Sequence, residues 1–205
     1  MKVYAEFERL LTGVEDFGTL VGKITEAFDR YVNQALYEAL IGVGSTLGSQ
    51  WYKTSALNDT TKETLRTLCM DVGMASDSEV VIMGTRAALA SVFALNDVSW
   101  ASSEMKNEMY TTGRFGYWEG IRLVELKQGF KLNDTTQYLV ANDVLFIMPV
   151  GIDPMIKLVY EGDTRMYQVQ DAGAHMDMTY DSEVQTKLGI GVVTNAKFGY
   201  WKIIK

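Results

Sequence analysis

The chain has 205 residues, of which 47% are hydrophobic and 22% charged, and this composition excludes an intrinsically disordered protein and fits one domain or two lobes of one chain. One cysteine and one histidine exclude an internal disulfide scaffold, a zinc–cysteine site and a multi-histidine metal centre. The formal net charge of −7 disfavours general nucleic-acid binding and adhesion to anionic membranes, because both depend on basic side chains.

Nothing in the sequence predicts a targeting signal or a membrane segment. The N-terminal residues include Glu6 and lack the apolar core of a signal peptide. The longest apolar run, residues 144–150, is much shorter than the ~20 residues that a transmembrane helix requires. The single cysteine fits a reducing compartment such as the bacterial cytoplasm.

The first strong pattern is a long amphipathic helix. Apolar residues recur every three or four positions over residues 17–43, and charged residues occupy the opposite face. Thr12 or Asp16 is positioned to cap its start, and the glycines of segment 42–48 are expected to end it. A helix of about 28 residues would be about 42 Å long. We therefore expect a core helix that spans the whole molecule.

Helices and one strand alternate in the next part of the chain. Asn58 or Asp59 is positioned to cap a helix over residues 60–74. A buried strand is predicted over 79–83, and the segment then turns at Gly84. Two more helices are predicted, over 86–95 and 102–112. One strand between helices indicates a small α/β unit.

After Gly120 the hydrophobic period changes to two, which is typical of strands. Strands are predicted over 121–126, 137–140, 144–148, 155–161, 164–170, 184–194 and 198–204. Turns are predicted at Asn133-Asp134, Gly151, Gly162-Asp163 and Asn195. Because helices come first and strands later, the predicted class is α+β.

No pattern in the sequence supplies a reactive or ligand-binding site. The glycines of 42–48 match neither a dinucleotide-binding loop nor a Walker loop, and they end a helix instead of starting one. No G-x-S-x-G nucleophile motif occurs, and Cys69 lies on an apolar helical stripe, which predicts a buried structural thiol. We expect no catalytic residue, no metal ion and no cofactor.

One acidic cluster resembles a metal site only superficially. It consists of Asp171, His175, Asp177, Asp181 and Glu183. Its spacing does not fit a calcium-binding EF-hand loop started at Asp171. Because strand side chains alternate, its alternate residues would share one face, so a solvated face or a subunit contact is favoured over a metal site.

The aromatic residues give the best candidates for contacts. Segment 113–120 packs an arginine and three aromatics between glycines, and such residues are enriched at interface hot spots. The candidate subunit-contact residues are Trp100, Arg114, Phe115, Tyr117 and Trp118. An ordinary core role is the alternative for these aromatics, whereas base stacking would need more Lys and Arg nearby.

Four stretches, taken in order, resemble a known family. They are the approach to the long helix, 7–16; the strand and helix of 80–89; the glycine-rich segment 113–121; and the late strands of 187–199. In type and order these elements are similar to tailed-bacteriophage major capsid proteins with the Hong-Kong-97-type fold.

The resemblance implies a structural subunit and no enzyme. A peripheral lobe would comprise 1–75 with the long spine helix and the strands of 151–195. An axial lobe would comprise 76–150, and 196–205 would return to it as a strand. Copies would form pentamers and hexamers of an icosahedral virion shell that encloses DNA without sequence-specific binding, with scaffold and maturation protease as further partners and no membrane.

The sequence also departs from the family. Members carry an N-terminal arm and an extended loop before the spine helix, whereas here the helix begins within the first 20 residues, which suggests the shortened body of a longer subunit. Self-cross-linking is not carried over, because the loop that supplies one partner is absent. The alternatives are an encapsulin-like compartment shell, another virion component, and a small-molecule-binding or hydrolytic α+β domain.

Overall fold

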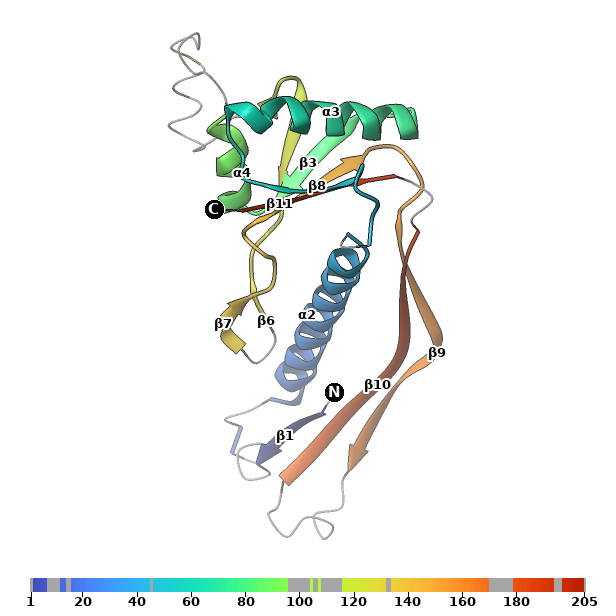
Figure 1. Ribbon diagram of the computed structural model, residues 1–205. Helices are drawn as coiled ribbons and strands as arrows, with labels where there is room; N and C mark the ends of the chain where they lie inside the picture. The colour runs from blue at the N-terminus through green and yellow to red at the C-terminus, as the bar shows by residue number, and fades with distance from the viewer. Residues whose placement is uncertain are drawn as a thin grey trace. The chain divides into compact units, whose positions relative to one another are not determined.

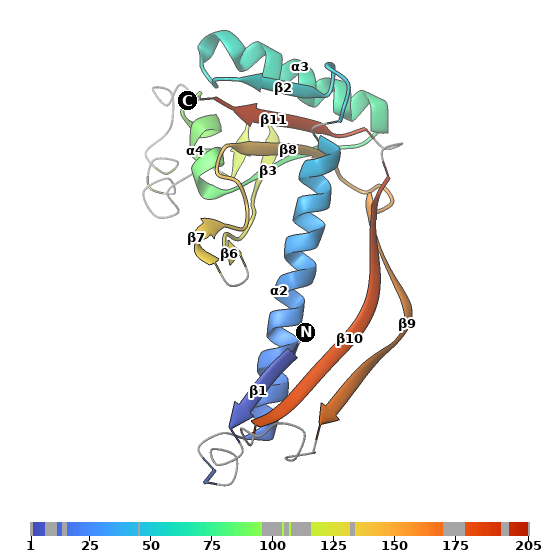
Figure 2. The same cartoon turned by 60° about the horizontal axis from the view of Figure 1, so that its bottom comes forward.

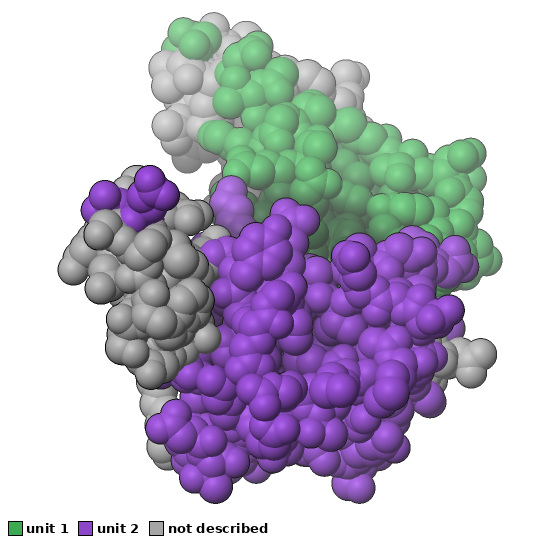
Figure 3. Space-filling view, turned by 90° about the horizontal axis from the view of Figure 1, so that it is seen from above, with its two compact units in different colours: residues 1–38, 156–191 green, residues 39–155, 192–205 purple. Residues whose placement is uncertain are grey.

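The computed structural model describes residues 2–6, 12–13, 16–44, 46–95, 104, 107, 116–131, 134–169, 179–193 and 197–204 (Figure 1). Helices and strands are both abundant, and the predicted α+β class is confirmed. The chain divides into two compact units, coloured separately in Figure 3. Unit 1 comprises Met1–Glu38 and Ile156–Gly191, and unit 2 comprises Ala39–Met155 and Val192–Lys205.

The long helix α2 spans Phe17–Gly44 and has the 28 residues that the periodicity predicts. Asp16 acts as its N-cap, because its Oδ2 accepts a hydrogen bond from the backbone N–H of Thr19 at 3.3 Å. Ile24, Val32 and Leu40 are buried, and eight residues turn an α-helix by two full turns plus roughly 80°, so these buried positions wind around the helix. The helix contributes residues to both units. None of the helices in the described part of the chain is long and apolar enough to cross a membrane.

Unit 1 also contains a sheet of long strands. Its strand order is β1-β10-β9, with β1 at Lys2–Glu6, β9 at Ile156–Val169 and β10 at Thr179–Val192. β1 pairs antiparallel with one end of β10, from Lys2 opposite Glu183 to Glu6 opposite Thr179. β9 is an edge strand, and its described side chains from Val159 to Tyr167 are all exposed.

The prediction of a turn at Gly162-Asp163 is wrong, because β9 runs through both residues as one strand. Gly162 has a φ of 78°, a value that glycine adopts at little cost and that occurs in strand irregularities. On either side of it β9 remains tied to β10. Lys187 Nζ lies 2.5 Å from Glu161 Oε2, and the hydroxyl oxygens of Thr164 and Thr186 are 2.5 Å apart. The glycine therefore bends a continuous strand.

Unit 2 is built on a mixed sheet of six strands (Figures 1 and 2). In spatial order the strands are β2 (Tyr52–Ser55), β11 (Gly199–Ile203), β8 (Val144–Pro149), β3 (Val80–Gly84), β5 (Ile121–Glu125) and β4 (Tyr117–Trp118). The β11–β2 and β3–β5 pairs are parallel, and the other three are antiparallel. Every residue of β8 is buried, as expected for an uninterrupted apolar run at the centre of a sheet.

Two helices bury their apolar stripes in the core of this unit. α3 spans Asp59–Ser76 and α4 spans Arg86–Phe93. Asn58 caps α3 in a reciprocal capping box with Thr61, and Thr85 caps α4. The core cluster joins these helices to the sheet and comprises Leu65, Leu68, Cys69, Val72, Ile82, Ala88, Leu89, Val92, Leu95, Trp118, Leu123, Leu145, Ile147, Trp201 and Ile203.

Neighbouring residues of the central strands pack on the opposite face. Tyr200 stacks on Tyr52 with ring centroids 5.3 Å apart, and it meets Phe146 edge-on at 5.4 Å. Gly44, the last residue of α2, lies so close to Tyr200 that a Cβ at this position would overlap the ring. Burial raises the pKa of Tyr200 to about 12, with further contributions from Tyr52 and Asp143.

The boundaries of the two units differ from the predicted division at residue 75. Both β2 and α3 belong to unit 2, because β2 is a strand of the six-stranded sheet and α3 contacts its strands β8, β11 and β3. Strands β1, β2, β4 and β6 were not predicted, since runs of two to five residues give little room for the strand period to show. The helix predicted over 102–112 falls outside the described residues except for residues 104 and 107.

Candidate subunit-contact site

Two of the five predicted contact residues lie in the described part of the chain. Trp100, Arg114 and Phe115 lie outside the described residues. Tyr117 and Trp118 form the two-residue strand β4, which is the edge of the six-stranded sheet. Tyr117 is 63% exposed, so its ring is available to another molecule.

Trp118 requires a correction, because its side chain is 0% exposed and belongs to the core cluster. Neighbouring residues of a strand point to opposite faces, so an exposed Tyr117 and a buried Trp118 follow from one strand geometry. Its indole Nε1 is buried without a hydrogen-bond partner among the described atoms. Trp118 therefore anchors the edge strand inside the subunit, and of the two candidates that the structure describes, Tyr117 is the exposed one.

The turn after β4 has a demanding backbone conformation. Glu119 and Gly120 connect β4 to β5 with φ values of 48° and 83°. Two successive positive φ values define the type I′ turn of a tight hairpin, in which glycine is favoured and glutamate is not. β4 and β5 pair antiparallel on either side of the turn, with Trp118 opposite Ile121. The backbone N–H of Leu123 donates a hydrogen bond to the carbonyl oxygen of Gly116 at 2.8 Å.

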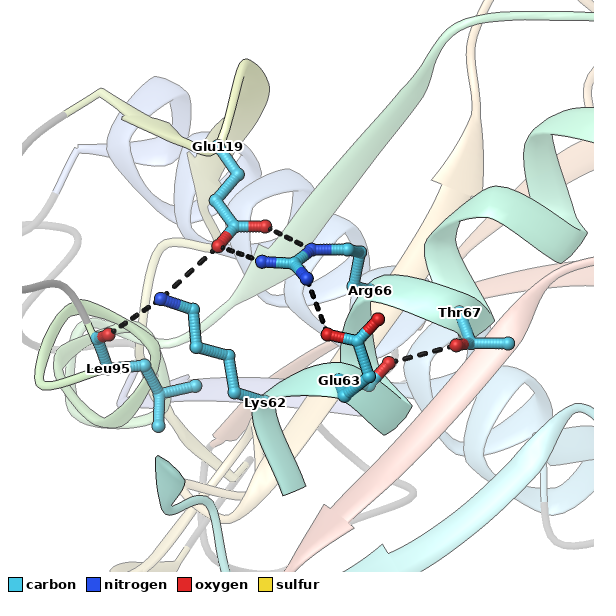
Figure 4. A network of polar contacts seen from close by, with 6 residues as sticks. All are labelled: Lys62, Glu63, Arg66, Thr67, Leu95 and Glu119. Carbon is cyan, nitrogen blue, oxygen red and sulfur yellow. Dashed lines mark hydrogen bonds and ion pairs between the residues drawn. The ribbon is translucent and has the colours of Figure 1, made fainter. Parts of the chain in front are cut away.

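Charged side chains of α3 hold this turn in place (Figure 4). The guanidinium of Arg66 donates to both oxygens of Glu119, from Nε to Oε2 and from Nη2 to Oε1, each at 2.7 Å. Lys62 Nζ lies 3.2 Å from Glu119 Oε1 and donates to the carbonyl oxygen of Leu95 at 3.3 Å. Arg66 also pairs with Glu63. The network thus ties the β4–β5 turn to α3 and to the residues that follow α4.

The network favours the ionised forms of its members. The hydrogen bonds from Arg66 are the main cause that lowers the pKa of Glu119, and Lys62 adds to the effect. The same contact raises the pKa of Arg66. A bidentate arginine–carboxylate pair also fixes the relative orientation of its two side chains. The network can therefore position the β4–β5 hairpin as well as stabilise it. Glu119 and its partners were not predicted as site residues; the Glu119-Gly120 dipeptide was the available signal.

Two other kinds of site, a metal centre and a reactive thiol, were considered among the described residues. No group of three or more His, Cys, Asp and Glu among them could hold a metal ion. Of the predicted acidic cluster, Asp171, His175 and Asp177 lie outside the described residues. Cys69 is buried as predicted, and desolvation raises its pKa to about 12, which makes its thiol a poor nucleophile.

A protein-family model described as "SPbeta prophage-derived putative capsid protein YonB" matches residues 1–202. The chain belongs to this capsid-protein family. No curated protein sequence matches it significantly. The prediction of a phage or prophage capsid protein, made from the order of four sequence stretches, is confirmed.

Solved structures show the same fold at low sequence identity. The mature capsid of bacteriophage PhiM1 is 12% identical with a TM-score of 0.64, over 100% of this chain and 70% of that one. The capsid of cyanophage P-SCSP1u is 11% identical with a TM-score of 0.63, over 100% and 71%. The SrpI encapsulin of Synechococcus elongatus is 11% identical with a TM-score of 0.55, over 98% and 71%. This capsid protein therefore has the predicted Hong-Kong-97-type fold.

Proposed function

We propose that the chain is the structural subunit of an icosahedral phage or prophage capsid, in which copies form pentamers and hexamers around DNA. The observation that carries this proposal is the match of a capsid-protein family to residues 1–202, together with a capsid fold over the whole chain. Such a subunit acts through its contacts with other copies. Its role is structural, and no catalytic step is part of it.

The charge of the chain fits this role. A net charge of −7 gives little general affinity for phosphate groups, so DNA would be enclosed without tight electrostatic binding, and we propose no sequence-specific contact with it. A scaffold and a maturation protease are the further partners that we propose. Subunits would be made in the bacterial cytoplasm and end in the virion shell.

The contact between copies is proposed to involve the β4 edge and the segment before it. Tyr117 is exposed on that edge, and the network around Glu119 fixes the turn that follows it. Trp100, Arg114 and Phe115 are kept as proposed contacts. An exposed aromatic next to a rigid turn loses little conformational entropy when it is buried by a neighbour.

The experiment is light scattering behind a sizing column over a wide concentration range, with negative-stain images of each peak. We expect discrete rings, pentamers, hexamers or closed shells. A strictly monomeric chain at all concentrations and in the presence of molecular crowders would contradict the proposal for this chain.

An encapsulin-like compartment is the second candidate, because the SrpI encapsulin shares the fold. The two functions differ in what the shell contains. Nuclease-protected DNA recovered from shells produced together with the rest of the prophage would support the capsid. Shells that hold a stoichiometric protein cargo and no DNA would support the compartment.

A further inference from the structure

A small hairpin in unit 2 presents two stacked aromatic rings to solvent. β6 (Phe130–Lys131) and β7 (Asp134–Tyr138) form a separate two-stranded sheet, in which Phe130 lies opposite Tyr138. The two rings are stacked with centroids 5.6 Å apart and planes 17° apart. Phe130 is nevertheless 55% exposed and Tyr138 54% exposed. Figures 1 and 2 both show this hairpin set apart from the six-stranded sheet.

The base of the hairpin is held by one side-chain amide. Gln128 Nε2 donates to Val140 O at 2.7 Å and to Asn142 Oδ1 at 2.9 Å. Gln128 Oε1 accepts from the backbone N–H groups of Gly129 and Val140, both at 3.0 Å. All four bonds link the two ends of the hairpin or fix Gln128 itself. The side-chain amide of Gln128 therefore replaces a pair of backbone hydrogen bonds between the two strands at the base of the hairpin.

The start of β7 is ordered in a similar way. Asp134 Oδ1 accepts from the backbone N–H of Thr136 at 2.8 Å and from its hydroxyl at 2.5 Å. Isolated two-stranded hairpins are only marginally stable in water. The side-chain hydrogen bonds of Gln128 and Asp134 therefore help to keep the β6–β7 hairpin in one conformation. The rings are thereby presented in a fixed geometry, and little entropy remains to be lost on binding.

We propose that the Phe130–Tyr138 ring pair is a contact by which one copy of the chain binds the next. This inference rests on the proposed function, because a second copy is the partner that every capsid subunit meets. Copies arranged in a ring make head-to-tail contacts, in which a projecting element of one subunit meets a different surface of its neighbour. Aromatic residues held rigidly at such a contact supply much of the binding energy.

The charge of the hairpin favours protein over packaged DNA as its partner. Residues 128–142 contain one lysine and one aspartate, and therefore have no net charge. Proteins that stack nucleic-acid bases on aromatic rings place those rings in a positively charged groove. Lys131 is the one basic residue of the hairpin and Asp134 balances its charge, so the rings do not lie in a positively charged groove and instead match an apolar surface of another subunit.

The test compares assembly of the wild type with that of the double variant Phe130→Ala/Tyr138→Ala. We expect association to weaken about tenfold or more, because two central aromatic contacts are removed. The melting temperature of the unassembled subunit should stay unchanged. Tyr138→Phe keeps the ring pair and should assemble like the wild type, as should Thr135→Ala, which changes an exposed side chain of the same hairpin.

The outcomes separate this inference from the proposed function. Normal shells formed by the double variant would overturn the inference and leave the proposed function standing. A wild type that never assembles would overturn both. A large fall in the stability of the unassembled double variant would show that the rings serve their own subunit, and normal shells that lose only their DNA would assign the rings to nucleic acid; either result overturns the inference.

A second measurement locates the contact directly. Assemblies made from equal amounts of unlabelled and ¹⁵N-labelled chain are treated with an amine-reactive cross-linker and digested for mass spectrometry. Lys131 in the hairpin should give mixed-isotope cross-links, which arise only between copies. Cross-links of Lys131 that are exclusively within one copy would contradict the proposal.

Discussion

Glu119 has an unfavourable backbone conformation, and its side chain makes favourable hydrogen bonds and ion pairs. A non-glycine residue at a φ of 48° carries a conformational cost, and the bonds from Arg66 and Lys62 offset it. Because these bonds need an ionised carboxylate, the pKa of Glu119 is lowered in the folded protein. The resulting stabilisation is present above the pKa of the unfolded chain and is lost as the pH falls through the folded pKa.

Glu119→Gln should therefore lower the free energy of unfolding by about 1 kcal/mol at neutral pH. The difference between variant and wild type should shrink as the pH falls through the carboxylate range, because the wild-type side chain then becomes protonated as well. Urea unfolding over a pH series measures this. Glu63→Gln is the matched control, since Glu63 pairs with the same arginine but its side chain is 72% exposed. A pH-independent difference would contradict the ion-pair explanation.

Tyr117 and Trp118 should respond oppositely to truncation. Tyr117→Ala removes an exposed ring and should weaken assembly while the unassembled subunit keeps its stability. Trp118→Ala removes a fully buried indole and should cost about 3–5 kcal/mol of folding free energy. Sizing chromatography and denaturant unfolding of both variants check this. Unaltered assembly of Tyr117→Ala would remove this residue from the proposed contact.

At the scale of elements, the predictability of each segment depended on its length. α2 was predicted at full length because 28 residues show the helical period many times. β9 was divided at Gly162-Asp163, because a glycine that bends a strand and one that ends it look the same in sequence. β2 is four residues long and too short to show alternation. Among the contact candidates, segment 113–120 showed that aromatics gather there, but not which of them is buried.

Two glycines at the C-terminal end of α2, Gly42 and Gly44, should respond differently to replacement by alanine. Gly44→Ala should destabilise the protein by about 1–3 kcal/mol, because the new Cβ would overlap the Tyr200 ring. Gly42→Ala, two residues earlier in the same helix, has open space around its Cβ and should stabilise by up to ~1 kcal/mol. Thermal unfolding of both variants measures the difference. Equal effects would show that Tyr200 moves aside easily.

At the scale of the whole molecule, the division into two units could not be predicted from local patterns. Unit 1 joins Met1–Glu38 to the distant segment Ile156–Gly191, and in unit 2 β2 pairs with β11 although about 150 residues of sequence separate them. Such long-range pairings depend on which apolar faces of distant elements pack together, and local sequence patterns do not show this. The predicted peripheral lobe of 1–75 would include β2 and α3, whereas both belong to unit 2 of the compact units.

Burial is distributed unequally between the units, and this predicts a difference in local stability. Of the described buried hydrophobic side chains, only Ile24 and Val32 belong to unit 1. β9 is an edge strand with exposed side chains, whereas β8 is buried throughout. Local opening requires less free energy where fewer apolar contacts must be broken. In the unassembled subunit, amide hydrogens of β9 and β10 should therefore exchange faster than those of β8 and β3.

Hydrogen exchange followed by mass spectrometry measures this on peptides from 144–149 and 156–167. The same experiment on assembled particles completes the argument. If neighbouring copies cover the exposed strands of unit 1, exchange in β9 should slow on assembly by much more than exchange in β8, which is already protected within the subunit. Equal exchange of both strands in the free subunit would contradict the inequality in burial. Unchanged exchange of β9 in assembled shells would show that the contacts between copies lie elsewhere on the molecule.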